Sequence, residues 1–183
     1  MPRCDRLRRV LGLCQAFARN VAYYRVGWRE EYKHVSDYSR HPRSANFWRV
    51  ANGNFIDMCV LEWCKLFADK KGKQSWGKIV ADGRAFKAAL LRHLEIDEAA
   101  FEEVIASLAR YRDKFLAHLD SDHTMNIPKL DIPLKAVEFY YSYVIEQEAT
   151  QGELAGFDPD LGVLFRAWEK EAETAYALLA GEP

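Results

Sequence analysis

The segment from residue 110 to residue 123 carries most of the side chains whose types and spacing could do chemistry. Arg112 and His118 lie six residues apart, and Asp113 follows the arginine directly. Arginine is permanently charged and histidine titrates near neutral pH, so the two could serve a functional site. A second possibility is a metal site, because the end of the segment holds four donors that suit a first-row metal ion: His118, Asp120, Asp122 and His123.

Arg112 has an unusual position on its expected helix. On a wheel that starts at Phe101 and turns ~100° per residue, Arg112 falls at about 20°. This is inside the apolar stripe, which contains Val104, Ile105, Leu108, Tyr111, Phe115 and Leu119. A cation there is costly unless it is paired or lines a cleft. Arg112 could therefore pair with a carboxylate of another helix, Glu62 or Glu138. His118 could in turn be a cation at a helix C-terminus.

The string RDKFLAH, residues 112–118, resembles the R-x(4–6)-H motif of the HEPN superfamily, in which a polar residue commonly follows the arginine. The longer string YRDKFLAHLD is similar to the AbiU-like abortive-infection branch. The upstream segment FWRVANGNFIDMCVLEWCKLFADKKGKQSW is similar to that branch too. The resemblance covers about residues 44–120. One departure is Asp120, because many active members carry a tyrosine two residues after the histidine.

The resemblance implies a metal-independent, toxin-like endoribonuclease in bacterial defence or stress, working as a homodimer without metal or cofactor. Arg112 would hold the scissile phosphate, and Asp113 would orient Arg112 or His118. His118 would act as general base or acid on the 2′-hydroxyl, which leaves a 2′,3′-cyclic phosphate.

Two alternatives stay open. One is a noncatalytic helical module that binds RNA or a protein such as an antitoxin, within a toxin–antitoxin or abortive-infection system. The other, from the residues themselves, is a metal-dependent enzyme built on residues 118–123.

Lysines in the segment 69–75 extend the expected RNA contact. Lys70, Lys71 and Lys73 form a basic loop with Trp76 behind it, and Lys114 adds a cation on the helix of the motif. Phosphate contacts together with an aromatic ring are typical of single-stranded RNA binding. A solvated lysine loop beside a core tryptophan is the alternative interpretation.

The charge of the chain is unevenly distributed. The total is −1, but residues 1–45 hold ten basic and four acidic residues, and residues 140–183 hold two basic and nine acidic ones. These ends carry +6 and −7, and the middle is neutral. The basic end could face an anionic partner, or the two ends could pack against each other.

Apolar residues recur every three or four positions and predict helices throughout. The expected helices cover about residues 4–34, 45–68, 76–80, 83–94, 98–119, 133–149 and 159–179, with Ser75, Asp82 and Asp97 as N-cap residues. The chain is thus expected to be one all-α, HEPN-like bundle of five to seven helices. Its parts would be a basic N-terminal helix and loop (1–43), a bundle core (44–150) and an acidic C-terminal helix (151–183).

Two features favour a cytoplasmic protein without a membrane anchor. No apolar run approaches the ~20 residues that a membrane helix requires. The four cysteines form no CxxC pair, which is typical of reduced thiols.

Overall fold

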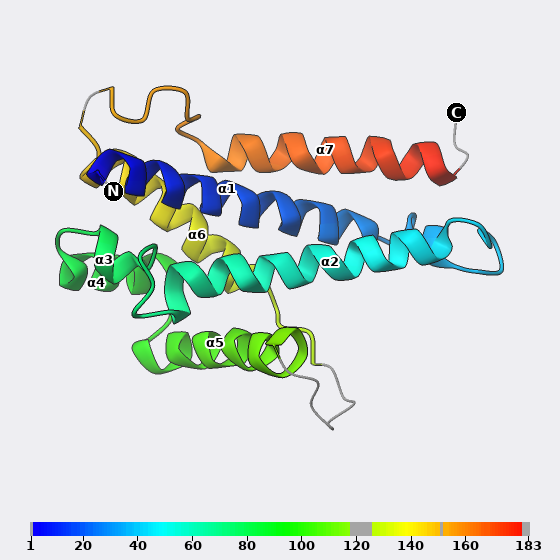
Figure 1. The fold of residues 1–183 in the computed structure, drawn as a ribbon, viewed down its shortest axis with the longest axis horizontal. Coiled ribbons are helices and arrows are strands. Elements are labelled where there is room, and N and C mark those ends of the chain that lie inside the picture. The colour runs from blue at the N-terminus through cyan, green and yellow to red at the C-terminus, as the bar shows by residue number, and fades with distance from the viewer. Residues whose placement is uncertain (1, 118–125, 151, 181–183) are drawn as a thin grey trace.

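The chain folds into a layered bundle of helices in a computed structural model (Figure 1). The structure describes residues 2–117, 126–150 and 152–180. Over these ranges it contains seven α-helices and no strand, which confirms the all-α prediction.

The α-helices are α1 (Arg3–Gly27), α2 (Ala45–Trp63), α3 (Trp76–Ile79), α4 (Gly83–Leu94), α5 (Glu98–Tyr111), α6 (Asp131–Tyr143) and α7 (Leu161–Ala180). A short 3₁₀ helix, η1, covers Lys33–Ser36. Three π-helical turns extend α2, α5 and α6: η2 (Cys64–Ala68), η3 (Arg112–Ala117) and η4 (Val144–Glu148). π-helical turns are rare in proteins, and those that occur are often found at functional sites. The η3 turn begins with Arg112, the arginine of the motif.

Helix α1 lies at the centre of the bundle. It packs against α2, α6 and α7, and Figure 1 shows α7, α1, α2 and α5 as successive layers. Apolar residues at three- and four-residue spacing are fully buried along α1: Leu7, Val10, Leu11, Cys14, Phe17 and Val21. They belong to one core cluster with residues of α2, α4, α5 and α6, so the core is not confined to residues 44–150.

The first helix ends at Gly27, seven residues earlier than the apolar pattern predicted. Glycine is a poor helix former, and here it is required by packing. The side chains of Asn52 on α2 and Tyr176 on α7, hydrogen-bonded at 2.6 Å, fill the space that a Cβ on Gly27 would occupy. Trp28, which the pattern placed in the buried stripe, is consequently outside the helix and 50% exposed.

The apolar spacing of residues 45–68 predicts one buried stripe, and this prediction is partly wrong; the stripe contains Phe47, Val50, Phe55, Met58, Leu61, Cys64 and Phe67. Phe47, Val50 and Met58 are exposed at 65%, 50% and 39%, whereas Cys59, Val60 and Trp63 are buried. The helix turns the second group towards α1 and the core, and in the described chain nothing covers the first group. Phe47, Val50 and Met58 are called the α2 apolar strip below.

Two of the three predicted caps fix the helices that lead to the motif. The Asp82 carboxylate accepts a hydrogen bond from the Ala85 amide at 2.9 Å, and that of Asp97 accepts one from Ala100 at 2.8 Å. Each satisfies an amide that the first helical turn leaves unpaired, which starts α4 and α5 as expected. Ser75 precedes α3 but makes no side-chain cap hydrogen bond.

Candidate functional site

Arg112 is the first residue of the η3 turn, and its guanidinium is held by two carboxylates. Its Nε donates to Oδ1 of Asp113 at 2.8 Å, and its Nη1 donates to Oδ1 of Asp69 at 2.6 Å. Asp69 directly follows the η2 turn, so the second bond ties the end of α5 to the end of α2. Arg112 thus pairs with a carboxylate from another part of the bundle, as one interpretation predicted, but the partner is Asp69 and neither of the examples Glu62 and Glu138.

These bonds also explain the electrostatics of Arg112. Its side chain is 23% exposed, so it needs partners for its charge. The hydrogen bond to Asp113 is the largest cause that raises the pKa of Arg112, and the bond to Asp69 adds to it. These two bonds use Nε and Nη1, and the described residues offer no hydrogen-bond partner to Nη2. Nη2 therefore remains able to bind a further acceptor.

The Tyr111 hydroxyl and the Cys64 thiol, both near Arg112, have raised pKa values. The Tyr111 hydroxyl donates to Oδ1 of Asp57 on α2 at 2.8 Å, and burial raises the pKa of this hydroxyl well above its usual value. Burial likewise raises the pKa of the Cys64 thiol to about 12, although Arg112 acts in the opposite direction. Neither group is therefore an acid or nucleophile near neutral pH.

Several predicted residues lie outside what the structure describes. His118 falls in the range 118–125, as do Asp120, Asp122 and His123 of the alternative metal site. Lys114 is half-buried on the η3 turn. The geometry of the site consequently rests on Arg112, Asp113 and Asp69.

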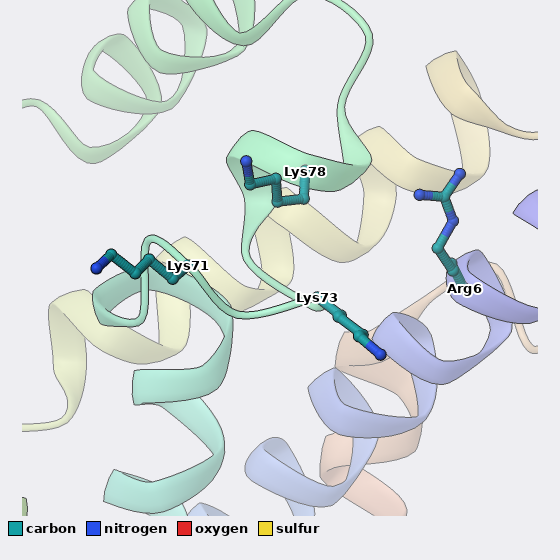
Figure 2. A pocket seen from close by; sticks show the side chains of 4 residues that line it. All are labelled: Arg6, Lys71, Lys73 and Lys78. Carbon is teal, nitrogen blue, oxygen red and sulfur yellow. The ribbon is translucent and has the colours of Figure 1, made fainter. Parts of the chain in front are cut away.

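The basic loop lines a cationic pocket (Figure 2). This pocket, of about 330 Å³, is lined by Arg6, Lys71, Lys73 and Lys78. Lys71 and Lys73 are among the predicted RNA contacts, whereas Lys78 and Arg6 are additional residues of this pocket. The only local feature that could have linked Lys78 to the basic loop is its position, five residues after Lys73. No spacing pattern could join Arg6 to residues more than 60 positions away.

The charges of this pocket are not compensated. Within the described ranges, none of its four cations forms an ion pair with a carboxylate. In addition, Nε of Arg6 is buried without a hydrogen-bond partner there. Four cations without paired carboxylates favour an anion in the pocket.

A second pocket adjoins the first. Its volume is about 180 Å³, and its lining includes Lys70, Trp76 and Lys78. Trp76 is half-buried and stacks on Phe86 with ring centroids 5.3 Å apart. The structure thus separates the predicted lysines, since Lys70 faces this aromatic pocket while Lys71 and Lys73 line the cationic one.

The acidic end of the chain packs against the basic helix, as one of the two charge interpretations predicted. Helix α7 lies on α1, and Arg29 donates to Glu169 at 3.0 Å and also pairs with Glu173. Arg29 follows the end of α1 whereas Arg6 lies near its start, about 30 Å away at ~1.5 Å per residue. These two carboxylates therefore do not neutralise the cationic pocket.

Comparison with known proteins returns no assignment. No family model matches the chain, and neither a curated protein nor a solved structure is significantly similar to it. Across the residues that the structure describes, no helix is both long and apolar enough to span a membrane. The same residues contain no group of three or more acidic, histidine or cysteine side chains arranged to hold a metal ion.

Proposed function

We propose that this protein is a metal-independent endoribonuclease that cleaves RNA at a site containing Arg112, Asp113 and His118. The observation that carries the proposal is the contact of Arg112 with Asp69. Lys70 and Lys71 follow Asp69 directly, so the arginine of the motif stands at the base of the basic loop. An RNA backbone that contacts these lysines would pass close to the guanidinium.

The chemistry follows from the resemblance of residues 112–118 to the HEPN motif. His118 takes the proton of the 2′-hydroxyl, and the resulting oxygen attacks the adjacent phosphorus. The bond from phosphorus to the 5′-oxygen breaks, and that oxygen takes up a proton. The products are a 2′,3′-cyclic phosphate and a 5′-hydroxyl. Arg112 offsets the negative charge that develops on the phosphate oxygens.

The hydrogen bonds of Arg112 hold its guanidinium in place and leave one nitrogen able to bind a phosphate. Asp113 binds Nε, which sets the plane of the guanidinium from the neighbouring position. Asp69 binds Nη1, and Nη2 can then donate to a phosphate oxygen without loss of either bond. Asp113 is accordingly a positioning residue in this proposal.

The proposal is tested by cleavage of structured and unstructured RNA in excess EDTA. We expect 2′,3′-cyclic phosphate ends from the wild-type chain and from Arg110→Ala, whose exposed arginine is a matched control on the same helix. Arg112→Ala and His118→Ala should both cleave far more slowly than the wild-type chain. Loss of wild-type activity in EDTA would contradict the metal-independent reaction, and undiminished activity in both variants would contradict the site.

A noncatalytic RNA-binding module is the second candidate, and one observation favours it. The two carboxylates around Arg112 exceed its single charge, as expected for a structural tie between α5 and α2. If RNA binds to the wild-type chain but is not cleaved under any condition, this candidate replaces the first.

A homodimer fits both candidates. The support is the α2 apolar strip, Phe47, Val50 and Met58, which leaves apolar surface uncovered along one helix. A second copy of the chain would bury this surface, and an antitoxin protein is the other partner that we consider. Measurement of the mass in solution distinguishes a self-associating chain from a monomer.

A further inference from the structure

Two adjoining pockets beside the basic loop differ in chemistry and share one wall. The larger one is bounded by four cations, Arg6, Lys71, Lys73 and Lys78. The smaller one has aromatic residues in its lining, and Lys78 belongs to both. Their volumes, about 330 and 180 Å³, together fall within the range of about 300–1,000 Å³ that is typical of ligand sites.

The cationic pocket suits several phosphate groups better than one small ion. Figure 2 shows that its side chains come from α1, the loop and α3, and that their charged ends are spread apart. A chain of phosphates can contact such ends in succession, whereas a single ion can contact only one or two.

The aromatic pocket suits a flat ring. Phe67 and Phe101 are almost fully buried behind it, so the half-buried Trp76 contributes most of the accessible aromatic surface. A nucleic-acid base can stack on such a ring irrespective of its sequence. Glu102 also lines this pocket. Its carboxylate repels phosphate but can accept a hydrogen bond from an amino group of a base.

The aromatic pocket therefore suits the base of a nucleotide, and the cationic pocket suits its phosphates. We infer that the two pockets form a nucleotide-binding site, with the base beside Trp76 and the phosphates among the four cations Arg6, Lys71, Lys73 and Lys78. Lys78 lines both pockets and contacts the phosphate nearest the sugar. The site contains neither Arg112 nor His118, but it shares Lys70 and Lys71 with the RNA path of the proposed cleavage site.

Two sources could supply this chemistry. One is a free nucleoside triphosphate, and the other is the 5′-triphosphate end of an RNA strand. The second source rests on the proposed function, whereas the first does not. Both share a base, a sugar and consecutive phosphates, and they can be distinguished by comparing ATP with a short RNA.

The experiment is isothermal titration of the full chain with ATP, inorganic triphosphate, and a pentaribonucleotide with either a 5′-triphosphate or a 5′-hydroxyl. We expect ATP to bind at least tenfold more tightly than inorganic triphosphate. A pentaribonucleotide that binds through its 5′-triphosphate should also compete with ATP. Lys78→Glu should abolish binding of both nucleotides, and Trp76→Leu should remove the preference over inorganic triphosphate.

Lys135→Glu is the matched control, because Lys135 is an exposed lysine of α6 that lines neither pocket. It should bind ATP like the wild-type chain, and circular dichroism of each variant checks its folding. His118→Ala, which retains the contact of Arg112 with Asp69, should also bind ATP normally, so failure of the cleavage site and failure of this site are distinguishable. Equal affinity for ATP and inorganic triphosphate, no binding of either nucleotide, or equal effects of Lys78→Glu and Lys135→Glu would overturn the inference.

Discussion

Arg112 donates a hydrogen bond from Nη1 to Oδ1 of Asp69 at 2.6 Å, and this contact joins the η3 turn to the first residue of the basic loop. The two residues are 43 positions apart in the chain. The bond fixes where the loop begins relative to the proposed cleavage site. It also places a carboxylate next to the group that would bind phosphate.

Removal of the Asp69 charge should affect stability and RNA binding in opposite directions. Asp69→Asn weakens the bond to Arg112, and because Asp69 is 42% exposed we expect a loss of only about 1 kcal/mol in unfolding free energy. RNA affinity should rise, since a negative charge beside the loop is lost. Urea unfolding and fluorescence anisotropy measure the two effects. Glu30→Gln, in an exposed pair with Lys33, should change neither, and lower RNA affinity in Asp69→Asn would contradict the proposal.

Glu148 should be one of the most important polar residues for stability. It is 5% exposed, and its carboxylate accepts hydrogen bonds from the Ala81 amide at 2.8 Å and from Arg3 at 2.7 Å. Glu148→Ala leaves that amide unpaired, and we expect a loss of about 2–3 kcal/mol. Glu148→Gln can still accept from Ala81 and should lose less. Urea unfolding gives both values, and equal losses would show that the Ala81 bond contributes little.

Two glycines of α1 should respond to alanine in opposite ways. At Gly27 a Cβ would overlap the hydrogen-bonded side chains of Asn52 and Tyr176, so Gly27→Ala should destabilise the fold by about 2 kcal/mol. At Gly12 no atom lies within 4 Å of the added Cβ. Gly12→Ala should therefore stabilise the helix by about 0.5–1 kcal/mol. Thermal unfolding compares the two, and a stable Gly27→Ala variant would contradict the close packing of α1, α2 and α7.

Glu62 should make the fold less stable as the pH rises. It is 6% exposed between α1 and α2, and burial raises its pKa above the ordinary value of 4.5 despite a hydrogen bond from Asn20 at 3.2 Å. A raised pKa means that the folded state binds this proton more tightly than the unfolded state. The stabilisation is present below pH 4.5 and is lost as the pH rises through the folded pKa.

The variant Glu62→Gln tests this pH dependence. It should be more stable than the wild-type chain near neutral pH, and the difference should shrink below pH 4.5. Urea unfolding at both values measures the effect. Lower stability of Glu62→Gln near neutral pH would show that the charged carboxylate is stabilised in its site.

The α2 apolar strip should control self-association. Phe47 is 65% exposed, so Phe47→Asp should leave the helical content measured by circular dichroism unchanged while it converts a dimer to a monomer. Leu178→Asp, at an apolar position of α7 that is 76% exposed, is the control and should remain dimeric. Light scattering coupled to gel filtration gives the masses. A wild-type monomer, or a dimer that survives Phe47→Asp, would contradict this interface.

Local signals in the sequence predicted the positions of the helices along the chain better than the contacts between the helices. The bounds of α4 and the cap hydrogen bonds of Asp82 and Asp97 followed from residues only three positions apart. In contrast, the requirement for glycine at position 27 depends on Asn52 and Tyr176, and the exposure of Phe47 depends on which face of α2 meets α1. An apolar pattern shows that a face is apolar, but not whether another helix of the same chain covers it.

In the candidate site, too, local features were predictable from the sequence, whereas contacts between distant residues were not. The position of Arg112 in an apolar stripe indicated a need for a partner, yet the partner proved to be Asp69, 43 positions upstream, instead of Glu62 or Glu138. The lysines of the loop were evident from composition, whereas Arg6 and Lys78 join Lys71 and Lys73 only through the fold.

The most direct test of the central claim is the rate of RNA cleavage in excess EDTA by Arg112→Ala relative to Arg110→Ala. Both variants remove one arginine from neighbouring positions, but only Arg112 contacts Asp69 and Asp113. We predict that Arg110→Ala cleaves like the wild-type chain and that Arg112→Ala is slower by about 10²–10³, the loss typical of a group that stabilises transition-state charge. Equal rates in the two variants would contradict the account.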